Sequence, residues 1–404
     1  MPRKGKKKIL WVSDAVATTG FSRVAHNIIK NLSTEKYEVH HLGINYLGDP
    51  HEYKHYIYPA LLGGDLYGKK RIRELVEAIK PDLFFFFNDA WIINTYLFEL
   101  ERLNIKDKPI VVYFPIDSYG SDAQWFERFH LVNDVCVYTE FAKQDILTTK
   151  AFAEPDKIHV IPHGVDTHKF FPFKDTELLR GVDAAKRKLY PKKILEQRTP
   201  FIILNANRNQ PRKRIDISLM AFDEFQKDKT DVMLYCHMGV EDAGVNVLKV
   251  ANRLGWDKKL IMSTLKDQIP GVPDGRLNLI YNASDVGLNT STGEGWGLTA
   301  FEHAATRRAQ IVPDHSANSE IWNKDNAFMI EAGDRIMYEH TNNIARIPKF
   351  DSVVECLERA YDMWHKGTLE EYAQAAYDNV TQPKYNWKVI SNQFDVIFSR
   401  LLGE

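Results

Sequence analysis

The chain has few cysteines, no excess of charge of either sign and no long hydrophobic run. Its three cysteines, Cys136, Cys236 and Cys356, are odd in number and far apart, which argues against a disulfide framework and suits a reducing compartment. Its 53 Lys and Arg residues nearly cancel its 54 Asp and Glu residues, so the molecule has no overall field that attracts nucleic acid or anionic lipid. We therefore expect a cytoplasmic protein.

The hydrophobicity pattern of the sequence also predicts no membrane span and no secretory signal. A membrane-spanning helix needs about 18 consecutive apolar residues, and the run Leu83–Phe87 is far shorter. The basic start of the chain, Met1–Lys8, precedes an apolar stretch that Asp14 interrupts, which argues against a secretory signal. We expect no transmembrane segment, and a basic tail that is solvated rather than bound to phosphates or lipid.

The residues that are present favour a globular α/β protein. Hydrophobic residues make up 44% and charged residues 26% of the 404 residues, a length with room for two or three domains. Short β-rich runs alternate with amphipathic helical stretches, as in proteins with parallel sheets. The predicted strands are Ile9–Ser13, Asp82–Phe87, Pro109–Phe114, Val135–Thr139 and Ile158–Pro162, then Phe201–Asn205, Val232–Tyr235, Leu260–Met262, Leu277–Tyr281, Val286–Leu288 and Gln310–Pro313.

We interpret this alternation as two Rossmann-like domains. The charged, proline-flanked segment Thr167–Thr199 interrupts the pattern and is predicted to be a linker. An early helix is expected over Ser22–Leu32, and a last amphipathic helix over Tyr385–Leu402. The expected domains are residues 1–180, 181–384 and the closing helix 385–404.

Polar residues follow two of the predicted buried strands. Asn88 and Asp89 come after the second strand, and Asp117 and Ser118 come after the third. Ligands of open α/β sheets bind beyond the carboxyl ends of the strands. We therefore expect these side chains at a binding cleft.

The most informative stretch is Gly293–Glu302, which reads GEGWGLTAFE. It places Glu294 in a glycine-rich loop and Glu302 in the helix predicted to follow. Gly295 and Gly297 let the backbone approach a ligand because they carry no Cβ, and free N–H groups at a helix start favour an anion. Such a loop can hold a diphosphate while its carboxylates accept bonds from hydroxyl groups, a combination that describes a nucleotide sugar.

Two parts of this prediction also have a simpler interpretation. Thr299 and Glu302 fit a helix capping box, in which the carboxylate bonds a backbone N–H near the helix start. Arg208 and Lys213, just past the predicted strand Phe201–Asn205, would on their own be a solvated basic turn. Beside an acidic, glycine-rich loop in the same half of the chain, two cations favour neutralisation of a diphosphate, Arg as a fork and Lys as a point charge.

Four ordered motifs resemble those of the family-four retaining glycosyltransferases, and the similarity spans nearly the whole chain. The motifs are Lys157–Phe170, Arg208 with Lys213, Tyr281–Asp285, and Glu294 with Glu302. The resemblance implies the GT-B architecture: two Rossmann-like domains face each other across a cleft, and a C-terminal helix packs back on the first domain. It also implies that no catalytic metal is needed.

The resemblance assigns roles to individual residues. Arg208 and Lys213 would bind the donor diphosphate, Glu294 the hydroxyls of the transferred sugar, and Glu302 the ribose hydroxyls. The implied donor-binding set is Gly20, Phe21, Arg208, Lys213, Glu294, Gly295, Trp296, Gly297, Leu298, Thr299 and Glu302. Asp117 stands near the place where many relatives have a histidine that bonds the primary hydroxyl of the sugar. The implied catalytic set is Arg208, Lys213, Glu294 and Asp117.

The sequence departs from the family pattern at two further places. It has Thr19-Gly20 where members often carry two glycines, and Arg307-Arg308 where a small residue or glycine is usual. The first departure concerns a contact with the donor phosphate, and the second follows the helix that carries Glu302.

The expected activity is transfer of a sugar from a nucleotide diphosphate sugar, as donor substrate, to an acceptor hydroxyl. The acceptor would be a glycan, a lipid-linked sugar or another hydroxyl compound, with no cofactor. The sequence has no Asp-x-Asp triplet, which fits a metal-independent site. Alternatives are a transferase acting on modified nucleic acid, suggested by the basic cluster Lys69–Arg73, an epimerase of the same architecture, and a nucleotide-sugar binding protein without turnover.

Overall fold

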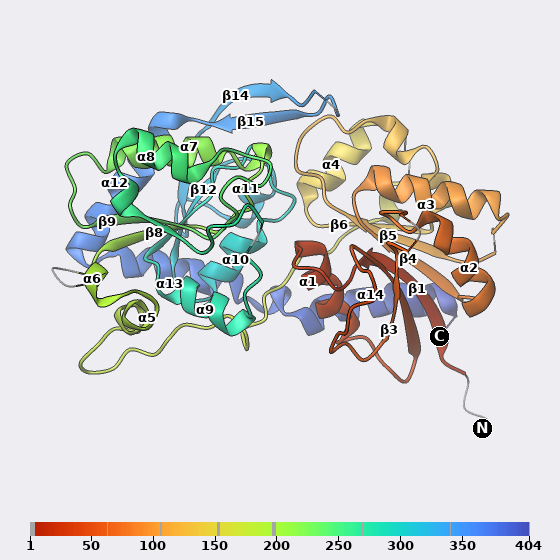
Figure 1. The fold of residues 1–404 in the computed structure, drawn as a ribbon. Coiled ribbons are helices and arrows are strands. Elements are labelled where there is room, and N and C mark those ends of the chain that lie inside the picture. The colour runs from red at the N-terminus through yellow and green to blue at the C-terminus, as the bar shows by residue number, and fades with distance from the viewer. Residues whose placement is uncertain are drawn as a thin grey trace. The chain divides into compact units, whose positions relative to one another are not determined.

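The computed structural model describes residues 5–62, 64–105, 107–151, 154–195, 199–268, 270–339 and 341–403. Within it the chain divides into two compact units, which are described separately. Unit 1 comprises Met1–Gly164, Glu339–Asn343 and Lys384–Glu404, and unit 2 comprises Val165–Tyr338 and Ile344–Pro383. Each unit contains a parallel sheet with helices (Figure 1).

Unit 1 is built on a seven-stranded parallel sheet with the strand order β3-β2-β1-β4-β5-β6-β7. Its strands are β1 (Lys7–Asp14), β2 (Tyr37–Ile44), β3 (Tyr56–Pro59), β4 (Leu83–Phe87), β5 (Ile110–Phe114), β6 (Asp134–Val137) and β7 (Ile158–Val160). Every residue of β4 and β5 is buried. Continuous apolar runs of this kind belong to strands covered on both faces, as the sequence predicted for these two.

Among the described residues, five α-helices accompany the sheet of unit 1, and the last of them follows unit 2 in the chain. They are α1 (Gly20–Ile29), α2 (Lys69–Ile79), α3 (Ala90–Arg102), α4 (Glu140–Thr148) and α14 (Trp387–Leu402). The rings of Phe394 and Phe398 in α14 lie with centroids 5.5 Å from that of Phe85 in β4. Ser391 Oγ donates to the Ile28 carbonyl of α1 (3.2 Å). The predicted closing helix is therefore confirmed, and it packs on unit 1.

Unit 2 is built on a six-stranded parallel sheet with the order β10-β9-β8-β11-β12-β13. Its strands are β8 (Phe201–Asn205), β9 (Val232–Cys236), β10 (Leu260–Met262), β11 (Val286–Leu288), β12 (Ala309–Pro313) and β13 (Phe328–Ile330), and a separate antiparallel pair is formed by β14 (Ala332–Met337) and β15 (Ile344–Pro348). Its helices are α5 (Gly181–Leu189), α6 (Lys192–Leu195), α7 (Ile215–Phe225), α8 (Val247–Leu254), α9 (Asp274–Asn282), α10 (Leu298–Ala304), α11 (Ala317–Ile321), α12 (Phe350–Lys366) and α13 (Leu369–Val380).

The segment that follows Gly164 packs on unit 2. The backbone N–H of Phe171 donates to Asn278 Oδ1 (3.1 Å), and that of Phe173 donates to Asn282 Oδ1 (2.7 Å). The Asn282 amide in turn donates to the Phe171 carbonyl (2.9 Å). These bonds explain why the division between the units falls at Gly164, earlier in the chain than the boundary expected after residue 180.

Two predicted elements are wrong. Leu277–Tyr281, predicted as a strand, lies within helix α9. Leu277, Ile280 and Tyr281 are buried at the three- and four-residue spacing of a helix face, and a short apolar run does not distinguish this from a strand. The predicted linker Thr167–Thr199 contains helix α5, whose Lys186 is buried.

Several strands were not predicted because their sequences lack a continuous apolar run. In β2, His40 and His41 interrupt the apolar pattern, yet both are buried. The edge strand β3 ends in Pro59, a residue that removes a backbone donor. In the sequence alone, histidine and proline residues are typical of loops, and their place in a strand depends on pairing with the neighbouring strand.

The interior of unit 2 contains an ion pair. Lys186 Nζ lies 2.6 Å from Asp285 Oδ2 and 2.8 Å from the Pro200 carbonyl, and both charged side chains are almost fully buried. Asp285 Oδ2 also accepts from the backbone N–H of Ile202 in β8 (2.7 Å). The carboxylate of the Tyr281–Asp285 motif is therefore committed to holding α5 and β8 together.

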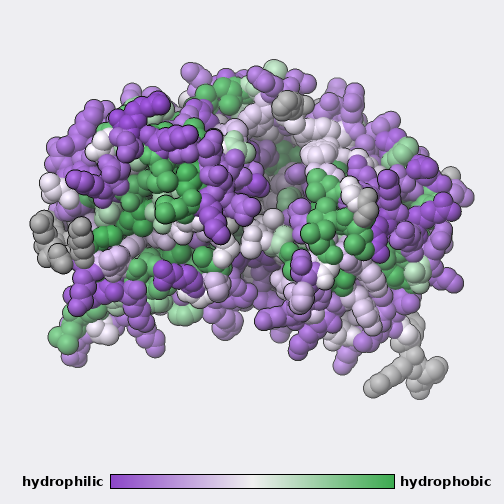
Figure 2. Space-filling model, in the orientation of Figure 1, coloured by the Kyte–Doolittle hydropathy of each residue, from purple (hydrophilic) through white to green (hydrophobic). Residues whose placement is uncertain are grey.

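Hydrophilic side chains cover most of the face shown in Figure 2, and hydrophobic atoms gather in smaller groups between them. Most of the large apolar side chains of the described residues are instead buried, many of them around one of the two sheets. Among the described helices, none combines the length and the apolar character needed to cross a membrane.

Candidate active site

The loop Gly293–Gly297 joins β11 to helix α10 through a left-handed residue. Gly297 is the N-cap residue of α10 and has φ of 85°, a conformation that favours glycine. No side chain caps the helix there. Thr299 lies inside the helix, and its hydroxyl donates to Asn207 Oδ1 (3.3 Å). Thr299 is therefore not the N-cap residue that the capping-box interpretation requires.

Glu294 is the centre of a buried charged network in unit 2. Its side chain lies 2.5 Å from Lys213 Nζ and 3.5 Å from Arg212 Nη1. The Asn289 amide donates to Oε1 (3.0 Å), and the Ser316 hydroxyl lies 3.0 Å from the backbone nitrogen of Glu294. The structure thus brings together Lys213 and Glu294, two residues that the sequence analysis placed in the site.

This network keeps Glu294 ionised. Burial alone would raise the pKa of the carboxyl group, but the nearby charges of Lys213 and Arg212, with the hydrogen bond from Asn289, outweigh it and lower the pKa to about 2. A buried carboxylate with this pKa is charged throughout the neutral range. It can therefore accept hydrogen bonds from hydroxyl groups without taking up a proton.

Arg208 lies with Lys213 in the loop that follows β8, but it pairs with Asp242 rather than with Glu294. Its Nε lies 2.6 Å from Asp242 Oδ2, and its Nη2 lies 3.1 Å from Asp242 Oδ1. The Arg208 side chain is 47% exposed, whereas Lys213 is 12% exposed. The guanidinium is therefore accessible to a ligand of unit 2, and a carboxylate already occupies its donor face.

The second predicted carboxylate, Glu302, lies on α10 and is also buried. The Tyr281 hydroxyl donates to Glu302 Oε2 (3.3 Å). His303, the next residue, has its Nε2 3.1 Å from the Tyr281 carbonyl, so Nε2 carries the proton. Burial, followed by the charge of Arg308, lowers the pKa of His303 to about 3, and the ring is neutral.

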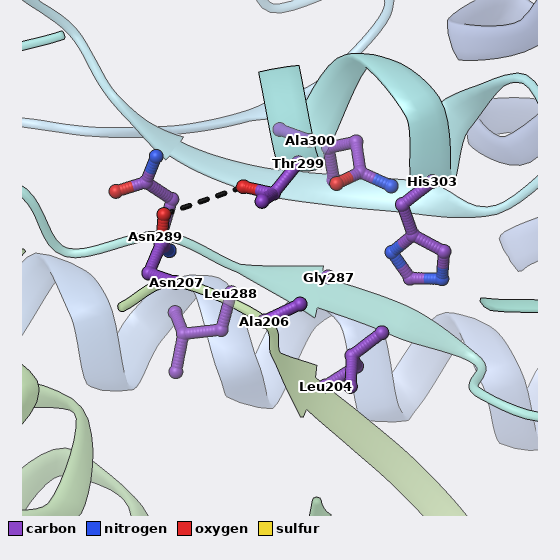
Figure 3. A pocket seen from close by; sticks show the side chains of 10 residues that line it. Leu204, Ala206, Asn207, Gly287, Leu288, Asn289, Thr299, Ala300 and His303 are labelled. Atoms are coloured by element: carbon purple, nitrogen blue, oxygen red, sulfur yellow. Dashed lines mark hydrogen bonds between the residues drawn. The ribbon is translucent and has the colours of Figure 1, made fainter. Parts of the chain in front are cut away.

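A small cavity of about 10 Å³, room for about one water molecule, lies where β8, β11 and α10 meet (Figure 3). Figure 3 shows the hydrogen bond between Thr299 and Asn207 at its edge. The pocket is lined by Leu204, Ala206, Asn207, Gly287, Leu288, Asn289, Thr299, Ala300, His303 and Gln310. Thr299, which the sequence predicted to lie in the donor site, therefore lines a small cavity beside the carboxyl ends of the parallel strands β8 and β11.

The other residues of unit 2 predicted to bind the donor lie in the loop Gly293–Gly297 or directly after it. Trp296 is buried, with its ring centroid 5.3 Å from that of Phe301, so its side chain supports the loop from inside. Gly295 and Leu298 are half-buried on either side of Trp296 and Gly297.

Gly20 and Phe21 lie in unit 1 at the start of α1. Thr19 caps this helix: its Oγ1 accepts from the Ser22 N–H (3.2 Å) and donates to Asp14 Oδ2 (2.5 Å). Gly20 is exposed, and the Phe21 ring lies 5.1 Å from that of Phe87. The departure from a pair of glycines therefore has a structural reason, because Thr19 joins the end of β1 to the start of α1.

Asp117 follows β5 in unit 1, as predicted. Its Oδ1 accepts from the Ser118 hydroxyl (3.1 Å), and its side chain is half-buried. It lies beyond the carboxyl end of a central strand, which is the position that the sequence analysis used to choose it.

Sequence reasoning missed four polar residues of this site. Arg212 and Asn289 contact Glu294 directly, and Ser316 contacts its backbone. Asn318 is buried, and its Oδ1 lies 3.3 Å from the place where a Cβ on Gly297 would be. Arg212 could have been found from its place beside Lys213, but Ser316 and Asn318 come from a distant helix start that no local pattern connects to the loop.

No group of three or more His, Cys, Asp or Glu side chains in the described ranges is arranged to hold a metal ion. All three cysteines are free and buried. Burial raises the pKa of Cys236 to about 12 and that of Cys356 to about 11, so both thiols are protonated at neutral pH.

The fold of the chain is that of the GT-B glycosyltransferases, as predicted. The sucrose-phosphate synthase of Thermosynechococcus elongatus matches it with a TM-score of 0.75 and 13% sequence identity, over 98% of this chain and 100% of that one. The catalytic domain of starch synthase IV from Arabidopsis thaliana, solved with ADP and acarbose, matches with a TM-score of 0.71 and 13% identity, over 99% of this chain and 100% of that one. At such identities the likeness concerns the fold.

Two curated relatives share sequence with part of the chain. The mannosylfructose-phosphate synthase of Agrobacterium fabrum is 25% identical over 186 residues, which are 45% of this chain and 38% of that protein. The D-inositol 3-phosphate glycosyltransferase of Segniliparus rotundus is 32% identical over 162 residues, which are 39% of this chain and 32% of that protein. The chain thus spans 38% and 32% of the lengths of these relatives. No protein-family model matches it.

Proposed function

We propose that the chain is a retaining, metal-independent glycosyltransferase of the family-four type, which moves a sugar from a nucleotide diphosphate sugar to an acceptor hydroxyl. The observation that carries this proposal is the buried, ionised Glu294 beside Lys213 and Arg212. A carboxylate for hydroxyl groups and cations for a diphosphate thus occur in one network of a GT-B fold. The similarity of part of the chain to a protein named as a glycosyltransferase supports the same activity.

The cations would act on the leaving group. When the bond between the anomeric carbon and the phosphate oxygen breaks, negative charge accumulates on the diphosphate. Lys213 and Arg212 would stabilise this charge from fixed positions, and Arg208 would add an exposed guanidinium with two donors. Preorganised donors of this kind are a large part of catalysis in water-poor sites.

The carboxylates would hold hydroxyl groups. Glu294 would accept hydrogen bonds from the transferred sugar and balance the positive charge that develops on its ring, because its low pKa keeps it ionised. Glu302 would accept from the ribose hydroxyls, and the backbone of Gly295 to Leu298 would contact the phosphates. On unit 1, Gly20 and Phe21 would contact the donor phosphate, and Asp117 the primary hydroxyl of the sugar.

The reaction in this proposal is balanced without a nucleophile or a metal from the protein. The acceptor oxygen forms the new bond to the anomeric carbon on the face that the diphosphate leaves. The acceptor proton passes to the departing phosphate oxygen. The sugar therefore keeps its anomeric configuration, and no further cofactor is consumed.

A donor screen tests the proposal. The purified protein is incubated with a panel of nucleotide sugars in EDTA, and released nucleoside diphosphate is measured. We expect slow hydrolysis of one donor, with NMR showing that the released sugar first has the anomeric configuration of the donor. A need for divalent metal, or inversion at the anomeric carbon, would contradict the proposal.

The same screen separates the other functions that the fold allows. Conversion of the donor to an isomer without an acceptor would identify an epimerase, and binding without turnover in the presence of acceptors would identify a binding protein. The acceptor panel contains glycans, lipid-linked sugars and DNA with hydroxymethylated bases, so it also tests the nucleic-acid alternative.

We propose the cytoplasm as the location of the protein, because its three cysteines are free, as is usual in a reducing compartment.

Substitution of the two cations gives a sharper test. Arg208→Ala and Lys213→Ala each remove a charge-assisted contact worth about 1.5–3 kcal/mol, so we expect turnover to fall by about ten- to a hundredfold or more. The measurement is turnover of the donor found in the screen. Lys249→Ala, which removes an exposed lysine from α8 of the same unit, is the matched control and should retain turnover. A folded Arg208 or Lys213 variant with near-normal turnover would contradict the proposal.

A further inference from the structure

The pairing of Arg208 with Asp242 has the geometry that a phosphate group would use. Two nitrogens of one guanidinium, Nε and Nη2, face two oxygens of one carboxylate at 2.6 and 3.1 Å. Carboxylate and phosphate oxygens have similar spacing and charge, so the guanidinium fork binds either of them in this way. A diphosphate that reaches Arg208 therefore competes with Asp242 for the same donors.

The carboxylate is better fixed than its partner. The Asp242 side chain is 14% exposed and the Arg208 side chain 47% exposed. Asp242 lies in the loop after β9, which Asn209 holds by donating to the carbonyls of Val240 (3.2 Å) and Val245 (2.8 Å). Asp242 itself has φ of 46°. The carboxylate is therefore held by its loop, whereas the long arginine side chain has room to exchange one partner for another.

We propose that Asp242 is an intramolecular substitute for the donor diphosphate, which occupies Arg208 in the ligand-free protein and lowers the affinity of the site for nucleoside diphosphates. This inference rests on the proposed function, because it takes Arg208 as a diphosphate ligand. The donor and the released nucleoside diphosphate both displace Asp242 from the guanidinium. The competition weakens the binding of both.

The opposite role for Asp242 makes a different prediction. A carboxylate that merely orients Arg208 toward the diphosphate would increase affinity, and its removal would weaken binding. The sign of the change in affinity therefore distinguishes competition from positioning.

The experiment measures the dissociation constants of UDP, GDP and ADP by isothermal titration calorimetry. Asp242→Asn removes the charge and keeps the size of the side chain, and asparagine adopts positive φ as readily as aspartate. Exposed ion pairs are worth about 0.2–1 kcal/mol, so we expect the nucleoside diphosphate that binds best to bind about two- to fivefold more tightly. In turnover assays the KM for the donor should fall by a similar factor, with little change in kcat.

Two further variants control for the general loss of negative charge. Glu241→Gln makes the same change in charge one residue away, where the carboxylate bonds the Asn246 amide (3.0 Å) rather than Arg208. It should change affinity much less than Asp242→Asn. In an Arg208→Ala background, Asp242→Asn should change affinity no more than Glu241→Gln does, because the shared partner is gone.

The binding measurements distinguish failure of the Asp242 proposal from failure of the proposed function. Unchanged or weaker binding by Asp242→Asn, or an equal gain in the Arg208→Ala background, would overturn the role of Asp242 and leave the proposed function standing. Binding of none of the three nucleotides to any variant, under conditions where the protein is folded by circular dichroism, would overturn both.

Discussion

At the residue scale, the unit 2 site depends on charges that neutralise one another before any ligand is present. Glu294 is ionised in a buried place because Lys213 and Arg212 lie against it. A ligand that separates these groups must replace their contacts with its own hydroxyl and phosphate oxygens. The arrangement therefore favours ligands that carry both kinds of group.

The ionisation of Glu294 predicts how stability depends on pH. Its pKa is about 2 in the folded protein and 4.5 in the reference state, so the carboxylate stabilises the folded protein above about pH 4.5 and loses that contribution as the pH falls toward 2. By linkage this contribution is on the order of 3 kcal/mol. Glu294→Gln should therefore lower the free energy of unfolding at pH 7, and the difference from the natural protein should shrink between pH 4.5 and pH 2.

Urea denaturation at a series of pH values measures this difference. Glu331→Gln is the matched control, because that carboxylate pairs with Lys349 at the exposed surface, where solvent screens the charges. Its substitution should change stability far less. A difference for Glu294→Gln that stays constant down to pH 2 would show that the carboxylate is not stabilised by its charge.

The residues of the site were predictable to the extent that they are close together in the sequence. Glu294 and Lys213 belong to local patterns, a glycine-rich loop and a basic strand end, and the structure joins them. Asn289 and Ser316 contact Glu294, and Asp242 contacts Arg208, each from another segment of unit 2. Such partners depend on which strands are neighbours in the sheet, and no spacing in the sequence shows that.

At the element scale, the predictions succeeded where the apolar pattern was long or unambiguous. The runs of β4, β5 and β8 and the periodic stripe of α14 were read correctly from the sequence. Leu277–Tyr281 was wrong because five residues fit a strand and a helix equally well, and only the packing of α9 decides between them. Strand β2 was missed because His40 and His41 interrupt its apolar pattern, although both are buried between the neighbouring strands β1 and β3.

Helix α14 should be a main source of stability for unit 1. The Phe394 ring is fully buried, with its centroid 5.5 Å from that of Phe85 and 5.1 Å from that of Tyr113. Phe394→Ala leaves a cavity in this core, so we expect it to lower the free energy of unfolding of unit 1 by about 3–5 kcal/mol. Val396→Ala, at a site that is 60% exposed on the same helix, is the control.

Chemical denaturation followed by circular dichroism measures both variants. Val396→Ala should change stability by less than about 0.5 kcal/mol. If Phe394→Ala cost no more than this control, the helix would contribute little to the stability of the unit.

At the scale of the whole molecule, the described residues include one apolar core cluster within unit 1 and another within unit 2. Each core belongs to one unit, so we expect differential scanning calorimetry to resolve two unfolding transitions. Phe394→Ala should lower the temperature of one of them. Asp285→Asn should lower the other, because it leaves the buried ammonium of Lys186 without its carboxylate, a change that costs on the order of 3–5 kcal/mol.

Phe394→Ala and Asp285→Asn can also show that the expectation of two transitions is wrong. A single transition whose temperature falls in both variants would mean that the units unfold together. In that case the stability of the whole chain would be one quantity, and substitutions in either core would reduce it.

The return of α14 to unit 1 has a consequence for the order in which the protein is made. Proteins emerge from the ribosome from their first residue onward, and domains generally fold as units when their residues are available. Unit 2 is nearly continuous in the chain and ends at Pro383, whereas unit 1 needs Lys384–Glu404 as well as its first 164 residues. Unit 1 begins before unit 2 in the chain and is therefore completed after it, because Phe85 lacks its partners Phe394 and Phe398 until helix α14 has been made.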